Sequence, residues 1–209
     1  MLITYTEEIN GINYTFSAEE ALRPFAEPLL EAIEYIPTER ITDGFRIRAG
    51  FSTFLLSEHG KGYDIAAPDY TDDPLTALNT DLTLALHIQY RQVLLLHKYG
   101  VVGKAVHFYD KLAVAKGALE KPNISMQRFG DLGGSGWSVQ NFVYDEKGSA
   151  RLVDAEDYEG VYAYELLTRR PELIDVLCLP DGYIAVFKGE ELVQLLDDEN
   201  NELIQHREH

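Results

Sequence analysis

The six histidines are the side chains best suited to metal binding or proton transfer, and their spacing indicates no site. None belongs to an HExxH motif or to another pattern of metal ligands. His206 and His209 lie three residues apart, but at the C-terminal end, where order is least expected. His87 and His97 suit ordinary positions on a helix. We expect neither a metal site nor a cofactor.

A glycine-rich stretch, Asp131–Val139, contains three glycines in four positions and the single tryptophan, Trp137. It has neither the GxxxxGK pattern of a phosphate-binding loop nor the GxGxxG dinucleotide pattern, and Ser135 lacks the GxSxG spacing of a nucleophile elbow. This glycine content indicates positive φ angles or a close approach of the backbone to another group. We predict a tight turn and no enzyme activity. Trp137 is either a core side chain, the favoured interpretation, or an exposed anchor for a partner.

Acidic residues are the other concentrated chemical feature, because no base occurs between Arg151 and Arg169. The acids lack the DxDxDG pattern of a calcium loop. They are typical of a solvated acidic loop or of a docking face, where tyrosine and tryptophan commonly act as anchors. The predicted partner-binding residues are therefore Asp154, Glu156, Asp157, Tyr158, Glu159, Tyr162 and Trp137.

The net charge of −17 comes from 35 acids against 18 lysines and arginines. It argues against nucleic-acid binding, which needs a basic surface, and against docking on anionic lipid. Solubility explains such a charge, and so does electrostatic steering toward a basic protein partner. Residues 1–120 carry 17 acids and 10 bases, and residues 121–209 carry 18 acids and 8 bases. A charged docking face is thus expected in the second part, which also has a smaller acidic cluster at 197–199.

The compartment is expected to be the cytoplasm. No run approaches the roughly 18 apolar residues of a membrane helix, and residues 1–8 lack the features of a signal peptide. Cys178 is the single cysteine, so no disulfide forms within the chain, and its apolar neighbours predict a buried, inert thiol.

The first half of the chain reads as hairpins and helices. Asn10-Gly11 predicts a type I′ turn between strands at 3–5 and 12–16. Residues 17–20 match a capping box for a helix that runs to Pro37, although Pro24 and Pro28 interrupt its pattern. Strands are expected at 45–48 and 51–56, with Gly50 as a bulge, and at 63–65. Residues 82–90 alternate like a strand, but the uninterrupted length of 82–99 favours a helix that ends at Gly100.

The second half alternates short strands with short helices. A hairpin is expected from 105–109 and 112–115, and helices at 162–167 and from Pro171 onward. Further strands are expected at 124–128, 137–139, 142–144, 151–153 and 182–187. The fold class is α+β, a mostly antiparallel sheet with hairpins and three to four helices packed on it, in two lobes. The lobes are expected at 1–120 and 121–209, joined through residues 116–123.

The order of motifs in the second half resembles one family. A Ser135-Gly136-Trp137 turn is followed by Tyr164-Glu165-Leu166-Leu167, then Arg170-Pro171-Glu172-Leu173, then Leu177-Cys178-Leu179-Pro180 and Gly182-Tyr183. Over about residues 124–209 this order resembles the bacterial immunity protein thirty-three domain family. The resemblance implies neutralisation of a polymorphic toxin, and it supplies a role without a set of binding residues.

Two hypotheses of different classes follow. The first is a cytoplasmic immunity protein that binds a toxin domain, expected to be basic, and occludes its active site. The second is a small-ligand-binding or housekeeping scaffold with a pocket near Trp137.

Overall fold

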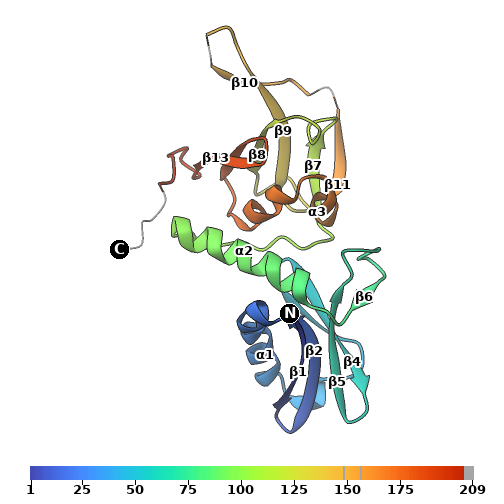
Figure 1. Ribbon diagram of the computed structural model, residues 1–209. Coiled ribbons are helices and arrows are strands. Elements are labelled where there is room, and N and C mark those ends of the chain that lie inside the picture. The colour runs from blue at the N-terminus through green and yellow to red at the C-terminus, as the bar shows by residue number, and fades with distance from the viewer. Residues whose placement is uncertain (148, 156, 205–209) are drawn as a thin grey trace. The chain divides into compact units, whose positions relative to one another are not determined.

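The computed structural model describes residues 1–147, 149–155 and 157–204 (Figure 1). Contacts between residues divide the chain into two units, 1–91 and 92–209. Each unit is built around a mostly antiparallel sheet with helices, which confirms the α+β class and the two lobes. No helix in the described residues is both long and apolar enough to cross a membrane.

The sheet of the first unit has the strand order β1-β2-β5-β4-β3, with β6 paired to β5. Its strands are β1 (Leu2–Ile9), β2 (Ile12–Glu19), β3 (Phe45–Ala49), β4 (Ser52–His59), β5 (Gly62–Pro68) and β6 (Leu78–Asn79). The opening hairpin is confirmed, because Asn10 and Gly11 both have positive φ, as a type I′ turn requires. Gly50 lies in the turn between β3 and β4 with φ +56°, so it forms a turn and not the expected bulge.

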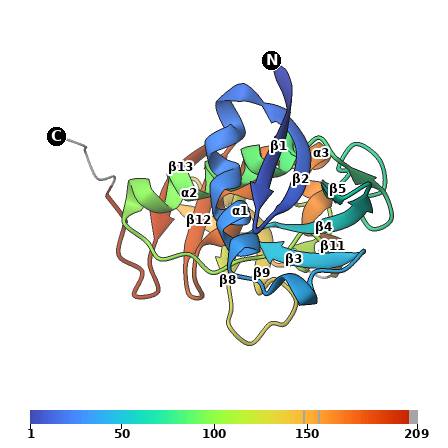
Figure 2. The same cartoon turned by 90° about the horizontal axis from the view of Figure 1, so that it is seen from below.

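The expected helix from Ser17 is wrong at its start. Ser17 belongs to β2, where its amide donates to the carbonyl of Thr80 at 2.9 Å. The chain then forms the 3₁₀ helix η1 (Glu20–Ala26), which contains Pro24, and the α-helix α1 (Glu27–Glu34; Figure 2) follows with a proline in its first turn. A proline is compatible with a first turn but not with a helix interior, and so the segment is divided into two helices. A short 3₁₀ turn, η2 (Thr38–Arg40), follows.

The core of the first unit lies between α1, its sheet and the beginning of the helix α2 (Thr83–Tyr99). Phe16, Leu30, Ile33, Phe54 and Leu86 are among the buried side chains that form it. These residues occur at helical spacing on α1 and α2 and at alternate positions on the strands, so their burial follows from the sequence pattern.

Residues 83–99 form a helix, α2 (Thr83–Tyr99), as their length predicted. The Asp81 carboxylate accepts a hydrogen bond from the Thr83 amide at 2.9 Å and caps its beginning. Gly100, with φ +65°, ends it. The division between the two units falls within this helix, between Arg91 and Gln92.

The sheet of the second unit has the strand order β11-β7-β9-β8-β12-β13, with β10 paired to β9. Its strands are β7 (Lys111–Ala115), β8 (Asn123–Arg128), β9 (Trp137–Tyr144), β10 (Ala150–Leu152), β11 (Tyr158–Tyr162), β12 (Ile184–Lys188) and β13 (Glu191–Leu196). Figure 2 shows the β12–β13 pair in red. Between β11 and β12 come η3 (Ala163–Glu165), α3 (Leu166–Arg169) and η4 (Pro171–Cys178).

The expected hairpin at 105–115 is wrong. Only its second half is a strand, β7, which pairs with β11 and, in parallel, with β9. The Asp110 carboxylate accepts from the His107 amide at 2.8 Å and turns the chain before β7 begins. Residues 116–123 therefore connect β7 to β8 within one sheet, and the division between units lies nearer the N-terminus than the predicted joint.

Candidate functional site

The sheet of the second unit has one buried face and one face with exposed side chains. Ile124, Met126 and Val139 alternate toward the buried face, where η4 contributes further apolar side chains. Ser125 and Val186, at the intervening positions, are half-buried. We call this second face the outer face of the sheet, and two hollows lie on it.

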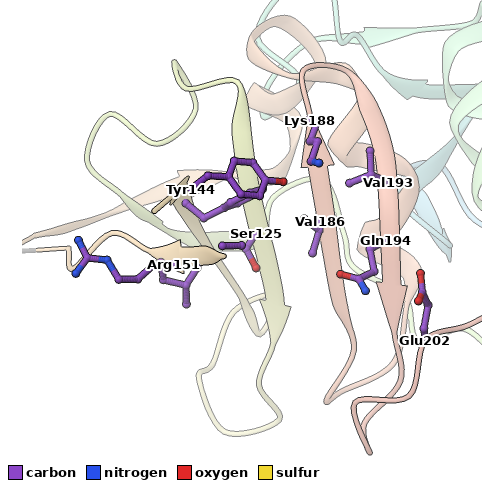
Figure 3. A pocket seen from close by; sticks show the side chains of 11 residues that line it. Ser125, Tyr144, Arg151, Val186, Lys188, Val193, Gln194 and Glu202 are labelled. Carbon is purple, nitrogen blue, oxygen red and sulfur yellow. The ribbon is translucent and has the colours of Figure 1, made fainter. Parts of the chain in front are cut away.

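The larger hollow has a volume of about 370 Å³ and is lined from β8, β9, β10, β12 and β13 (Figure 3). The ring of Tyr144 reaches across from β9 toward β12, and the ammonium of Lys188 lies 4.9 Å from the centre of this ring. Val186 and Val193 add apolar surface, while the guanidinium of Arg151 points away from the hollow. The apolar side chains and the tyrosine ring of this lining suit an apolar or aromatic side chain of a partner.

The smaller hollow, of about 290 Å³, lies between β7, β11 and the glycine-rich loop. Leu132, Gly133 and Gly134 line it on the loop side, and Lys111, Tyr158 and Gly160 are among the residues that line it from the strands. The scaffold hypothesis expected this loop to line a pocket, and it does. Trp137, however, is absent from the lining.

The glycine-rich loop is a tight turn held against β7, as its composition predicted. Ser135 donates to the Lys111 carbonyl twice, from its amide at 3.1 Å and from its hydroxyl at 2.9 Å. Gly134 and Gly136 have positive φ, and a Cβ on either residue would lie 2.7 Å from a carbonyl oxygen. Ser135 is buried and its hydroxyl has a structural role.

The structure corrects the assignment of Trp137 as a partner-binding residue. Its side chain is fully buried, and the indole Nε1 donates to the Leu177 carbonyl at 3.1 Å. The side chain begins β9 on the buried face of the sheet, so the indole joins β9 to the end of η4. Trp137 is a core residue, the interpretation that the sequence favoured.

Arg128 is a structural residue that the sequence analysis missed. It is 3% exposed, and its guanidinium donates to the carbonyls of Lys104, Ala105, Leu177 and Leu179. Burial lowers the pKa of Arg128, and the nearby Asp181 carboxylate, 3.4 Å from Nε, acts in the opposite direction. The signal was available, because Arg128 continues the alternation of Ile124 and Met126 toward the buried face.

Four of the predicted partner-binding residues lie together at one edge of the sheet. Asp157 directly precedes β11, Tyr158 and Glu159 begin it, and Tyr162 ends it. Tyr158 is 44% exposed, and its hydroxyl accepts a hydrogen bond from Gln140 on β9. Asp157, Tyr158 and Glu159 are exposed and Tyr162 is half-buried, and we call these four residues the exposed strip at β11.

The acids in this strip, and those that precede it in the sequence, differ in their partners. The Asp157 carboxylate lies 2.7 Å from the ammonium of Lys116, and that of Glu159 lies 4.0 Å from the guanidinium of Arg169. Asp154 is exposed, and no ion pair joins it to any residue that the structure describes. Glu156 lies outside the described residues, as do His206 and His209.

The remaining chemical candidates have structural roles. Asp197 accepts hydrogen bonds from the amides of Glu199 and Asn201, so the second acidic cluster forms a turn. Burial raises the pKa of the Cys178 thiol to about 12, which agrees with the inert thiol predicted. Over residues 1–147, 149–155 and 157–204, no group of His, Cys, Asp and Glu side chains has an arrangement that could hold a metal ion.

Comparison with known proteins identifies a family. The family model described as Imm33-like domain matches residues 91–198, just over half of the chain. The matched range begins at the division between the units and contains every strand of the second sheet. The chain matches no curated protein and no solved structure.

Proposed function

Because the chain belongs to the Imm33-like domain family, we propose that it is an immunity protein that neutralises a cognate bacterial toxin by binding the toxin domain. The observation that carries the proposal is the family match, which contains the whole second sheet. The exposed strip at β11 and the two hollows on the outer face supply a surface of the kind that a protein partner needs.

The proposed mechanism is occlusion of the toxin's active site, without catalysis by the immunity protein. Tyr158 combines exposure with a fixed hydroxyl position, which suits an interface anchor because little side-chain freedom is lost on binding. The net charge of −17 favours a basic toxin domain and faster association with it. We place the protein in the cytoplasm, where it would bind a toxin that acts in that compartment.

Co-expression with the toxin domain encoded by the adjacent gene tests this proposal. We expect the protein to restore growth and to copurify with an inactivated variant of the toxin domain. The matched control is an unrelated immunity protein expressed at the same level. Copurification without restored growth would contradict occlusion, and failure of both would remove the proposed function for this pair.

The smaller hollow keeps the scaffold hypothesis as a second candidate function, because the loop lines it as that hypothesis expected. A ligand bound there would raise the melting temperature of the protein, since it would bind the native state alone. Thermal melts in fractionated metabolite pools measure this effect. Trp137 is the single tryptophan, but its fluorescence is a weak reporter of ligand binding in this hollow. The indole is buried and does not line the hollow.

A further inference from the structure

The two edges of the second sheet are treated differently by the chain. At the β13 edge, the Leu203 amide donates to the Leu195 carbonyl at 2.8 Å, and Glu202 forms a bridge with Leu196. The chain thus covers part of that edge with its own backbone. The opposite edge is β11, and within the described residues no strand pairs with its outer side.

The hydrogen bonds next to β11 show which of its backbone groups point outward. The Lys116 amide donates to the Asp157 carbonyl at 3.1 Å, and the Ala163 amide donates to the Asp110 carbonyl at 2.8 Å. In an antiparallel pair, bonded positions alternate along each strand. Odd-numbered residues of β11 therefore bond to β7, and the backbone groups of Tyr158, Gly160 and Tyr162 point away from it.

Two of these outward residues are available for pairing. The Tyr162 amide is occupied, because it donates to the Glu165 carboxylate at 2.9 Å. Tyr158 and Gly160 are exposed, and no hydrogen bond to their backbone amides or carbonyls is found in the described part of the chain. Each presents one donor and one acceptor, which is the repeating unit that an added strand requires.

This edge lacks two of the common protections against pairing. β11 contains no proline, and its register with β7 is regular, without a bulge. Gly160 has no side chain, so a neighbouring backbone can approach it closely. The acids Asp154, Asp157 and Glu159 flank the edge, so they disfavour a second copy of this acidic chain and favour a strand with basic side chains.

We propose that an extended segment of the toxin domain, carrying basic side chains, pairs with the outer edge of β11 and adds a strand to the second sheet. This inference rests on the proposed immunity function. The added strand bonds to the backbone groups of Tyr158 and Gly160, and one of its apolar side chains enters the smaller hollow beside Gly160. Backbone pairing gives affinity, and the hollow with its flanking acids gives specificity.

Hydrogen exchange of the wild-type protein, alone and with the inactivated toxin domain, tests the pairing directly. The amides of Tyr158 and Gly160 should exchange rapidly in the free protein and at least about a hundred-fold more slowly in the complex, because pairing removes them from solvent. Binding without any added protection at these two amides would overturn the inference and leave the immunity function standing. Protection in the free protein that rises with its own concentration would identify a second copy as the occupant and also overturn it.

Substitution of Gly160 gives an independent measurement. Gly160→Pro removes an outward amide without touching the bonds to β7, so we expect affinity for the toxin domain to fall about ten-fold or more. Gly160→Ala keeps the amide, and within the protein its Cβ would meet only the flexible Lys111 side chain at 3.3 Å, so it should lose less affinity than Gly160→Pro. Equal affinity of all three proteins would contradict the pairing.

A proline on the first sheet is the matched control. The two-residue turn makes Ile9 and Ile12 a bonded pair, so by alternation the Thr6 amide points away from β2. Thr6→Pro therefore removes an equivalent amide from β1, an outermost strand that lies outside the family match. It should leave toxin affinity unchanged, and a loss equal to that of Gly160→Pro would overturn the assignment to β11. If the wild-type protein neither bound the toxin domain nor restored growth, the immunity function itself would be refuted.

Discussion

At the scale of single residues, the most distinctive side chains of the second unit are committed to holding it together. Trp137 and Arg128 both donate to the carbonyl of Leu177, at 3.1 and 3.2 Å, and so fasten the end of η4 to neighbouring strands. Ser135 fastens the glycine-rich loop to β7 in the same way. The proposed recognition of a toxin therefore relies on side chains with fewer internal partners, of which Tyr158 is the most exposed aromatic on β11.

Substitution of Trp137 should change stability and not recognition. We expect Trp137→Phe to lower the free energy of unfolding by about 2 kcal/mol, since it leaves unfilled volume and removes one buried hydrogen bond. Urea denaturation measures this, and the affinity for the toxin domain should match that of the wild type.

Tyr158→Ala is the reciprocal control. It should change the free energy of unfolding by no more than about 1 kcal/mol, because the side chain is exposed, and it should weaken toxin binding. Weaker binding by folded Trp137→Phe, together with full binding by Tyr158→Ala, would reverse these assignments.

At the scale of elements, the glycine-rich loop, the prolines and the capping residues decide where the chain turns. Gly134 and Gly136 permit the loop to pass against the carbonyls of Lys111 and Phe129. Gly133 has the same sign of φ but open space around the position of a Cβ. The loop thus contains two kinds of glycine. Gly133 is favoured by its positive φ alone, whereas Gly134 and Gly136 are favoured by positive φ and also by the nearby carbonyl oxygen that a Cβ would meet.

Alanine substitutions should separate these two kinds. Gly133→Ala should cost about 1 to 2 kcal/mol, the price of a non-glycine residue at positive φ. Gly136→Ala should cost at least about 1 kcal/mol more, because its Cβ would also lie 2.7 Å from the Phe129 carbonyl oxygen. Thermal or urea denaturation of the two variants provides the comparison, and equal losses would show that the backbone moves to accommodate the methyl group.

At the scale of the whole molecule, the acidic charge is spread over both units. Residues 1–91 carry 15 acids and 6 bases, and residues 92–209 carry 20 acids and 12 bases. The greater acidity of the second part, computed for a division at residue 120, therefore does not hold for the units that the structure defines. The net charge of the whole chain could speed association with a basic partner, and so could the local acids beside β11. Charge changes at different places on the chain distinguish these two effects.

Charge reversal at two positions makes that separation. Asp154→Lys together with Asp157→Lys should slow association with a basic toxin domain about ten-fold at low salt and weaken its salt dependence. The matched control, Glu31→Lys with Glu34→Lys, changes the net charge equally on exposed positions of α1 in the first unit, and it should slow association less. Stopped-flow kinetics over a range of salt concentrations measure both, and equal rates for the two pairs would contradict an acidic docking strip.

The sequence by itself determined the features that depend on neighbouring residues. Asn10-Gly11 specifies a turn through its φ preferences, and the length of 83–99 specifies a helix. The glycines of 133–136 specify a tight turn, and the ordered motifs of the second half indicated the family, which the match over 91–198 shows. These are local signals, because backbone conformation and short spacing are fixed within a few residues.

Tertiary structure decided what depends on segments far apart in the sequence. The pairing of β7 with β11 and β9 places residues 111–115 in the second sheet and puts Asp157, Tyr158 and Glu159 at the edge of that sheet. Burial of Arg128 and Trp137 depends in the same way on the position of η4, some fifty and forty residues further along the chain. A local sequence pattern cannot predict which strand pairs with which, or which carbonyl accepts from a buried donor, because both depend on the packing of the whole sheet.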